Sequence, residues 1–181
     1  SMMADHDHGN PWWLKRNQPQ EVCFMHGLPV ITDGKLSLNR WFEPTKDLGR
    51  YVALQAFAGS YDPANTKQLS PARAQEIVEL IRARGYKVIQ MGLPSEHRLE
   101  NVTFIDRDFF GAVKDLLGCR ALITTDSGFN WSASCYDHPT LGLYSHEYYD
   151  MGPHGGENRV HTIQPLNPNA IHLSARRVND I

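Results

Sequence analysis

Three polar segments, each placed directly after an aliphatic run, carry the side chains best suited to binding chemistry. The first contains Gly59, Ser60 and Lys67, the second ends at Glu96, and the third is Asp126–Ser127–Gly128. A lysine ammonium and the N–H groups that begin a helix attract anions. A carboxylate such as that of Glu96 can accept hydrogen bonds from ribose hydroxyls, as acidic residues do in dinucleotide sites. Together these groups suit a diphosphate joined to a sugar.

The same residues also have ordinary structural interpretations. Asp126 and Ser127 are residue types that favour the N-cap of a helix. Lys67 and Glu96 are types that mostly lie in solvent. The sequence contains neither GxGxxG nor GxxxxGK(S/T), which argues against the usual dinucleotide and P-loop sites. The binding hypothesis therefore depends on whether the fold gathers the three loops in one place.

The order of the predicted elements places the three loops at one edge of a sheet. Aliphatic runs predict strands, and amphipathic segments that follow Ser70–Pro71, Asp108 and Asp126 predict helices between them. We expect Phe109 on the inward face of its helix. Strands are expected at 51–57, 86–91, 101–105, 121–125, 140–144 and 160–164, and a terminal helix from Ser174 to Ile181. Alternating strands and helices predict an α/β fold, a mostly parallel sheet covered on both faces, in which loops at the carboxyl ends share one edge.

Residues 1–50 differ from the rest of the chain. They are rich in proline, hold three of the four tryptophans (Trp12, Trp13 and Trp41) and show no long periodic segment. We expect an irregular N-terminal arm over residues 1–50 and a Rossmann-like domain over residues 51–181. The tryptophans would either pack on the main domain, which we favour because tryptophan is mostly buried, or form a surface for an acceptor or partner.

Composition excludes several classes of protein. The chain has 181 residues, 41% of them hydrophobic, and a net charge of −2, so no basic stripe for nucleic acid is expected. No apolar run is long enough to span a bilayer. Three scattered cysteines favour a cytoplasmic location. Nine histidines show no compact ligand spacing, so no metal site and no cofactor are predicted.

Three motifs occur in order along the chain and carry a family resemblance. They are Gly59–Ser60 with Lys67–Gln68–Leu69–Ser70–Pro71, then Met91–Gly92–Leu93–Pro94–Ser95–Glu96, then Thr125–Asp126–Ser127–Gly128 with Ser132–Ala133 and Pro139–Thr140–Leu141–Gly142–Leu143–Tyr144. With them, the chain from about Tyr51 onward resembles the C-terminal, nucleotide-sugar-binding half of GT-B glycosyltransferases. It looks most like glycosyltransferase family 9, the ADP-heptose:lipopolysaccharide heptosyltransferase group.

The resemblance implies a role for each matching residue. Ser60, which follows Gly59, and Lys67 would contact the diphosphate, and Glu96 the ribose. The 126–128 turn would contact the phosphates and the sugar, and Arg107 would lie near the base. Two features depart from the family pattern. Trp131 stands where the family usually has a histidine, and residues 1–50 are shorter than the N-terminal domain that carries the family's catalytic base.

The resemblance also implies an activity. The enzyme would transfer a sugar from a nucleoside-diphosphate donor to a hydroxyl of a carbohydrate or other acceptor without a metal. The catalytic base is unknown: Asp33, Glu43 and Asp47 are candidates within the chain, and nothing selects among them. The first alternative is a non-catalytic nucleotide-sugar-binding or interaction module that needs a partner chain. An oligomeric structural protein and a sugar-nucleotide epimerase are further alternatives.

Overall fold

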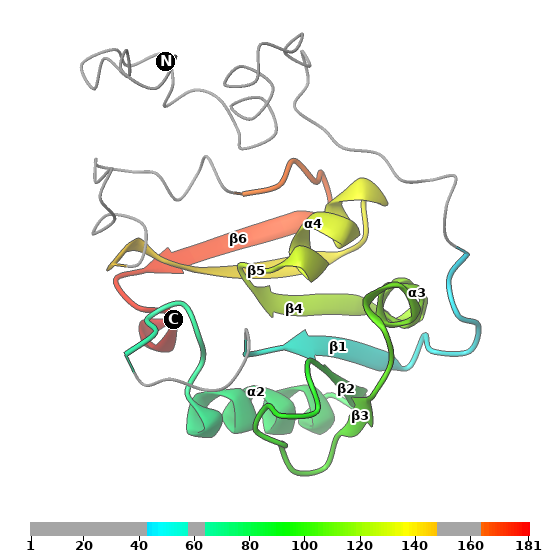
Figure 1. Ribbon diagram of the computed structural model, residues 1–181, viewed down its shortest axis with the longest axis horizontal. Helices are drawn as coiled ribbons and strands as arrows, with labels where there is room; N and C mark the ends of the chain where they lie inside the picture. Colours follow the sequence, from blue (N-terminus) through cyan, green and yellow to red (C-terminus); the bar gives the residue numbers. More distant parts are fainter. Residues whose placement is uncertain (1–42, 58–63, 148–163) are drawn as a thin grey trace, which may run out of the picture.

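The computed structural model describes residues 43–57, 64–147 and 164–181, and these form one six-stranded sheet (Figure 1). Neighbouring strands pair in parallel throughout, in the order β3-β2-β1-β4-β5-β6. The strands are β1 (Tyr51–Gln55), β2 (Lys87–Met91), β3 (Thr103–Ile105), β4 (Ala121–Thr125), β5 (Thr140–Ser145) and β6 (Ala170–Ala175). The predicted parallel α/β architecture is confirmed.

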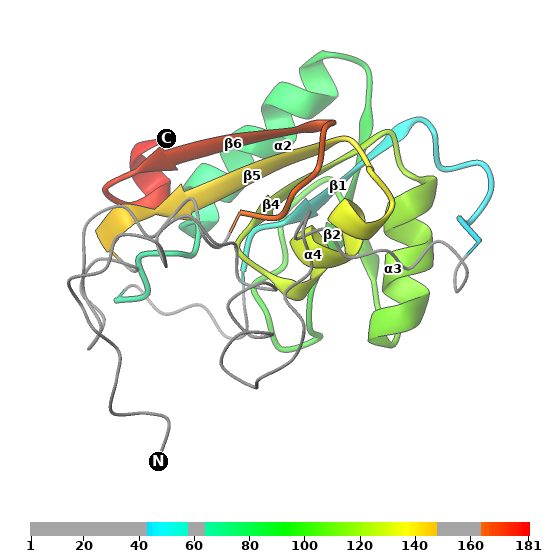
Figure 2. The same cartoon turned by 90° about the horizontal axis from the view of Figure 1, so that it is seen from above.

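Helices cover both faces of the sheet. Helix α2 (Pro71–Ala83) lies on one face, and α3 (Phe109–Gly118) and α4 (Gly128–Cys135) lie on the other (Figure 2). Alternate residues of β1 point into two separate cores, so that Leu54 packs with α2 residues and Ala53 packs with residues of α3 and α4. No helix in the described part of the chain is long and apolar enough to cross a membrane.

Local signals fix the helix starts where the sequence predicted them. Ser70 is the N-cap of α2, its side chain accepts from Arg73 N at 3.2 Å, and Pro71 follows at the first helical position. Asp108 caps α3 in the same way, because its Oδ1 accepts from Gly111 N at 2.6 Å. Both caps hold the preceding loop at the carboxyl edge of the sheet.

The C-terminal prediction is wrong. Ser174 and Ala175 end strand β6, paired with Tyr144 and Ser145, and only a short 3-10 turn, η3 (Val178–Asp180), follows. Residues 174 and 175 form a strand because they can hydrogen-bond to the edge of the sheet at β5, and no local pattern in the sequence indicates this pairing. The strand predicted at 160–164 lies outside the described residues except for Gln164, which is in a bend.

The prediction that Phe109 points inward is also wrong, since its side chain is 46% exposed. Phe109 is the first residue of α3 and sits beside the start of α4 rather than over the sheet. The inward positions of α3 begin one turn later, at Ala112 and Val113.

The strand order creates a topological switch point between β1 and β4. From β1 the chain moves outward to β2 and β3, then returns through α3 to place β4 on the other side of β1. Connections leave the carboxyl ends of these two strands in opposite directions, which opens a crevice at that edge. Ligands of open α/β sheets bind in such crevices.

Candidate functional site

The switch point is held together by a buried polar network. Gln55, at the end of β1, lies beside Thr124 of β4 in the sheet register, and both are buried. The Gln55 Oε1 atom lies 2.8 Å from Thr124 Oγ1 and 3.4 Å from Thr125 Oγ1, and the Gln55 amide donates to the Phe57 carbonyl. Thr124 Oγ1 also lies 3.0 Å from Ser127 Oγ. These bonds fix the position of the Asp-Ser-Gly turn relative to β1.

The 126–128 turn leads directly into α4. Ser127 occupies the N-cap with an extended backbone, but its hydroxyl makes no capping hydrogen bond and lies against Thr124 instead. Gly128 is the first residue of the helix and is exposed. The start of α4 thus faces the carboxyl edge of the sheet, where its N–H groups favour an anion.

A second buried hydrogen bond anchors the first turn of α4. Asn130 Nδ2 donates to the Tyr144 hydroxyl at 2.6 Å, and both side chains are buried. Burial raises the pKa of Tyr144; the Asn130 hydrogen bond acts the other way, and the charge of Asp126 raises the pKa further. The hydroxyl therefore stays neutral at physiological pH. Trp131, the next residue along α4, is half-buried.

Glu96 is folded back against the end of β2. Its side chain is buried, its backbone N–H donates to the Leu93 carbonyl at 2.9 Å, and its carboxylate lies over Gly92. A Cβ atom at Gly92 would come 1.9 Å from Glu96 Oε2, so only glycine leaves room for this arrangement. Gln90 braces the same loop by donating to the His97 carbonyl at 2.6 Å.

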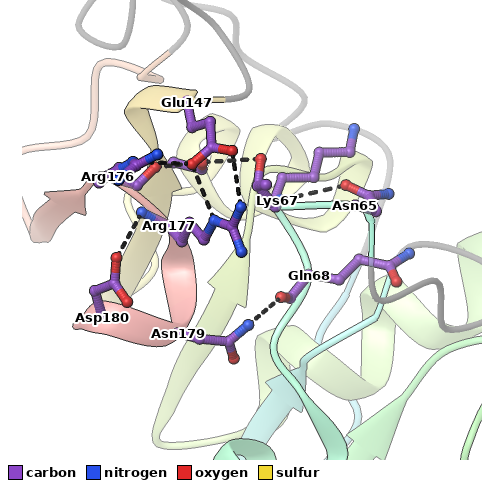
Figure 3. Close-up of polar contacts among 10 residues, drawn as sticks. Asn65, Lys67, Gln68, Glu147, Arg176, Arg177, Asn179 and Asp180 are labelled. Atoms are coloured by element: carbon purple, nitrogen blue, oxygen red, sulfur yellow. Dashed lines mark hydrogen bonds and ion pairs between the residues drawn. The ribbon is translucent and has the colours of Figure 1, made fainter.

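Lys67 lies on the loop between β1 and α2 (Figure 3). Its backbone N–H donates to Asn65 Oδ1 at 3.2 Å, and Oγ1 of the neighbouring Thr66 lies 3.2 Å from Ser145 Oγ. Thr66 also accepts from Val178 N through its carbonyl. Because of these contacts, the segment that contains Lys67 lies near the carboxyl ends of β5 and β6.

A charged cluster not anticipated from the sequence adjoins Lys67 (Figure 3). Glu147 follows β5 and accepts from Arg177 Nε at 2.9 Å and Nη2 at 3.0 Å, and from Arg176 Nε at 3.2 Å. Ser145 Oγ donates to the Arg176 carbonyl at 2.9 Å. The cluster therefore fastens the segment after β6 to the end of β5.

Acid is expected to loosen this cluster. The Arg177 hydrogen bond is the largest cause that holds the pKa of Glu147 below its ordinary value of 4.5, and the charges of Arg177 and Arg176 add to it. Because the folded pKa is the lower one, the pairing stabilises the fold above the ordinary pKa and is lost as the pH falls through the folded pKa. The stability advantage of wild type over Glu147→Gln in urea unfolding should be constant near neutral pH and shrink below about pH 4.5.

A double-mutant cycle isolates this effect. In an Arg177→Gln background, Glu147→Gln should lose most of its effect at neutral pH, because the main partner has gone. An unchanged difference between wild type and Glu147→Gln from pH 7 down to pH 3 would contradict the assignment.

Arg107 is engaged away from the switch point. Its Nε lies 3.1 Å from Asp115 Oδ2, and its side chain runs past Gly111 along α3. Asp115 is buried and also accepts from Thr45 Oγ1 at 2.6 Å. The geometry therefore gives Arg107 a structural partner, and its contact with a base stays a prediction.

The parallel sheet brings most of the predicted binding residues to one edge. Lys67, Glu96, Arg107 and the 126–128 turn all follow carboxyl ends of strands, in loops after β1, β2, β3 and β4 respectively. Gly59, Ser60 and Asp33 lie outside the described residues.

Two of the suggested catalytic bases lie at the opposite edge. Glu43 and Asp47 precede β1, and Thr45 between them bonds through its backbone N–H to the Lys114 carbonyl, near the end of α3. The structure does not bring either carboxylate to the switch point. A cavity of about 320 Å³ lies on yet another surface, between α2 and strands β4 to β6, and contains none of the predicted binding residues.

Sequence reasoning missed the residues that position the loops. Gln55, Thr124, Asn130 and Tyr144 are polar residues inside predicted strands or a helix, and their pairing depends on the strand order. The sequence does contain a signal for Glu147 as a polar residue at the sheet edge, because Glu147 follows a predicted strand as Glu96 does.

Comparison with known proteins supports the fold. No protein-family model and no curated protein sequence matches the chain. Several solved structures are similar to this chain. E. coli heptosyltransferase WaaC with ADP aligns with a TM-score of 0.56 and 15% identity over 75% of this chain and 41% of that chain. WaaC with ADP-2-deoxy-2-fluoro heptose aligns with a TM-score of 0.57 and 15% identity over 86% and 48% of the two chains.

The third structure is a glycosyl transferase family 9 protein from Veillonella parvula. It aligns with a TM-score of 0.50 and 18% identity over 90% of this chain and 41% of that one. The chain thus spans less than half of the length of each of these three structures. The fold is that of one half of these transferases, as the sequence resemblance implied.

Proposed function

We propose that this chain is the donor-binding half of a GT-B glycosyltransferase and that it holds a nucleoside-diphosphate sugar at the carboxyl edge of its sheet. The observation that carries the proposal is that the Lys67, Glu96 and Asp126–Ser127–Gly128 loops all follow carboxyl ends of strands, at the edge of the sheet that contains the switch point. The similar structures include transferases crystallised with ADP and with an ADP-sugar analogue, which supports a nucleotide ligand.

Each group has a chemical task in this proposal. The start of α4 and the Lys67 ammonium would bind the diphosphate and offset the charge that it gains as leaving group. Glu96 would accept hydrogen bonds from the ribose hydroxyls, and its buried, braced position would keep that acceptor in place. The bond between the sugar C1 and the phosphate oxygen breaks while a bond from C1 to the acceptor oxygen forms.

The acceptor proton must go to a base, which we place outside the described residues. Neither Glu43 nor Asp47 is near the switch point. In this proposal the Lys67 ammonium and the N–H groups at the start of α4 serve in place of a metal ion.

Calorimetric titration with ADP, GDP, UDP and pyrophosphate tests the proposal. We expect wild type to bind at least one nucleoside diphosphate, and Lys67→Met to weaken that binding by about ten-fold, because one charged contact with a phosphate is lost. Lys87→Met is the matched control, since Lys87 begins β2 at the opposite edge and lies over the Tyr51 ring. If none of the four compounds binds to wild type, the proposal is refuted.

A further inference from the structure

An exposed aromatic surface borders the start of α4. Phe109 and Phe110 open α3 and are 46% and 60% exposed. The Phe109 ring stacks on Phe129 with centroids 5.1 Å apart and an interplanar angle of 30°. The Phe110 ring stands edge-on to Phe109 at 5.8 Å and 71°. We call Phe109, Phe110 and Phe129 the aromatic surface.

This surface touches the turn that is proposed to bind the diphosphate. A Cβ atom built on Gly128 would lie 3.4 Å from both Cε2 and Cζ of Phe109, so the ring rests against the backbone where α4 begins. Phe109 follows β3 and Phe129 follows β4, so the rings occupy the same edge of the sheet as Asp126. A ligand with its phosphates at this turn has aromatic carbon as its immediate neighbour.

The exposure of these rings is not required for packing. The buried face of α3 is formed by Ala112, Val113, Leu116 and Leu117, and it does not include the two phenylalanines. Two adjacent exposed phenylalanines beside a proposed polar site therefore indicate a contact surface.

The polar groups of the neighbouring loop are engaged with the protein itself. The Arg107 guanidinium pairs with Asp115, and the Asp108 carboxylate caps α3 through Gly111 N. One N–H of the Arg107 side chain and one oxygen of the Asp108 carboxylate are thus already used, whereas Phe109 and Phe110 are 46% and 60% exposed. The geometry favours stacking over hydrogen bonds to the edges of a base.

We infer that Phe109 and Phe110 form a stacking surface for the nucleobase of the bound nucleoside diphosphate, and that they hold it without reading its identity. The inference rests on the proposed function, because it places the phosphates at the 126–128 turn. Stacking on an aromatic side chain accepts any base, since every base has a π face. Purines, with the larger ring system, should bind more tightly than pyrimidines by a small factor.

Calorimetry with ADP, GDP, UDP and pyrophosphate on the double variant Phe109→Leu/Phe110→Leu tests this inference. Leucine keeps apolar contact with Gly128 and Phe129 but removes the flat face. Affinity for ADP should fall by about ten-fold or more, the equivalent of one stacking contact. Affinity for pyrophosphate should stay within about two-fold of wild type, because pyrophosphate has no base. In wild type, affinities for ADP, GDP and UDP should lie within about ten-fold of one another.

Phe104→Leu is the matched control. Phe104 lies on the neighbouring strand β3, and its ring face is covered by the Arg98 guanidinium at 3.4 Å, so ADP affinity should not change. Circular dichroism checks that each variant is folded. Three results would overturn the inference: ADP affinity unchanged in the double variant, equal loss of ADP and pyrophosphate, or a wild-type preference of about a hundred-fold or more for one base. If wild type binds neither ADP nor pyrophosphate, the proposed function fails, and the inference fails with it.

Discussion

Replacing Gly92 by alanine is expected to weaken nucleoside-diphosphate binding by about ten-fold or more while the protein still folds. The new methyl group would lie 1.9 Å from Glu96 Oε2 and 2.8 Å from its Cδ, distances at which a non-bonded Cβ atom clashes with its neighbour. The obstacle is the end of a flexible side chain, so Glu96 can rotate away. Gly92 also has a φ of +157°, which alanine rarely adopts, so the substitution should strain the backbone of this loop as well. The carboxylate would then leave the position from which it accepts the ribose hydroxyls.

Titration calorimetry with ADP measures this effect, and Gly49→Ala is the matched control. A Cβ at Gly49 has nothing within 4 Å, so this variant should bind as wild type does. Glu96→Gln provides a second comparison, because it keeps the shape and removes the charge. If Gly92→Ala binds ADP with wild-type affinity, Glu96 is not a ligand of the nucleotide.

Replacing Gly142 by alanine is expected to lower the free energy of unfolding by about 1–3 kcal/mol, the usual cost of overpacking a core. The added Cβ would lie 2.9 Å from both His172 Nδ1 and Tyr144 Cε2, and 3.1 Å from the Tyr144 hydroxyl oxygen. Tyr144 is fully buried and bonded to Asn130, so it has little freedom to move. The strain would reach the first turn of α4 through that bond.

Urea unfolding of Gly142→Ala and of Gly49→Ala, monitored by circular dichroism, measures the difference. The Gly49 variant should stay within about 0.5 kcal/mol of wild type, as surface substitutions usually do. Combining Gly142→Ala with His172→Ala should restore part of the loss, because the imidazole that the methyl group meets is removed. Equal stability of wild type and Gly142→Ala would contradict the packing described for strand β5.

The parts of the fold that local signals determine were predictable from the sequence. The aliphatic run Ala121–Thr125 is β4 as predicted, and the Ser70–Pro71 and Asp108 caps begin α2 and α3. These features depend on residues close in the chain, whose propensities and hydrogen bonds act without tertiary contacts. The parallel sheet follows from the alternation of strands and helices.

Features that depend on distant partners were not predictable. Ser174 and Ala175 lack a strong strand signal and become a strand because β5 offers an edge to pair with. Helical periodicity placed Phe109 inward, but its position at the start of α3 puts it beside Gly128 at the sheet edge. The sequence likewise predicted an anion site at the 126–128 turn but not the Gln55–Thr124 contact that positions it.

The most direct test of the account is the map of amide resonances that shift when ADP is added to the isotopically labelled protein. We predict that the largest shifts lie in the loops at the carboxyl edge, around Lys67, Glu96 and Ser127–Gly128. Amides at the opposite edge, such as those of Lys87, Arg120 and His138, should not move. Two results would contradict the placement of a nucleotide at the switch point. One is a set of shifts confined to that opposite edge or to the cavity between α2 and strands β4 to β6, and the other is the absence of shifts at saturating ADP.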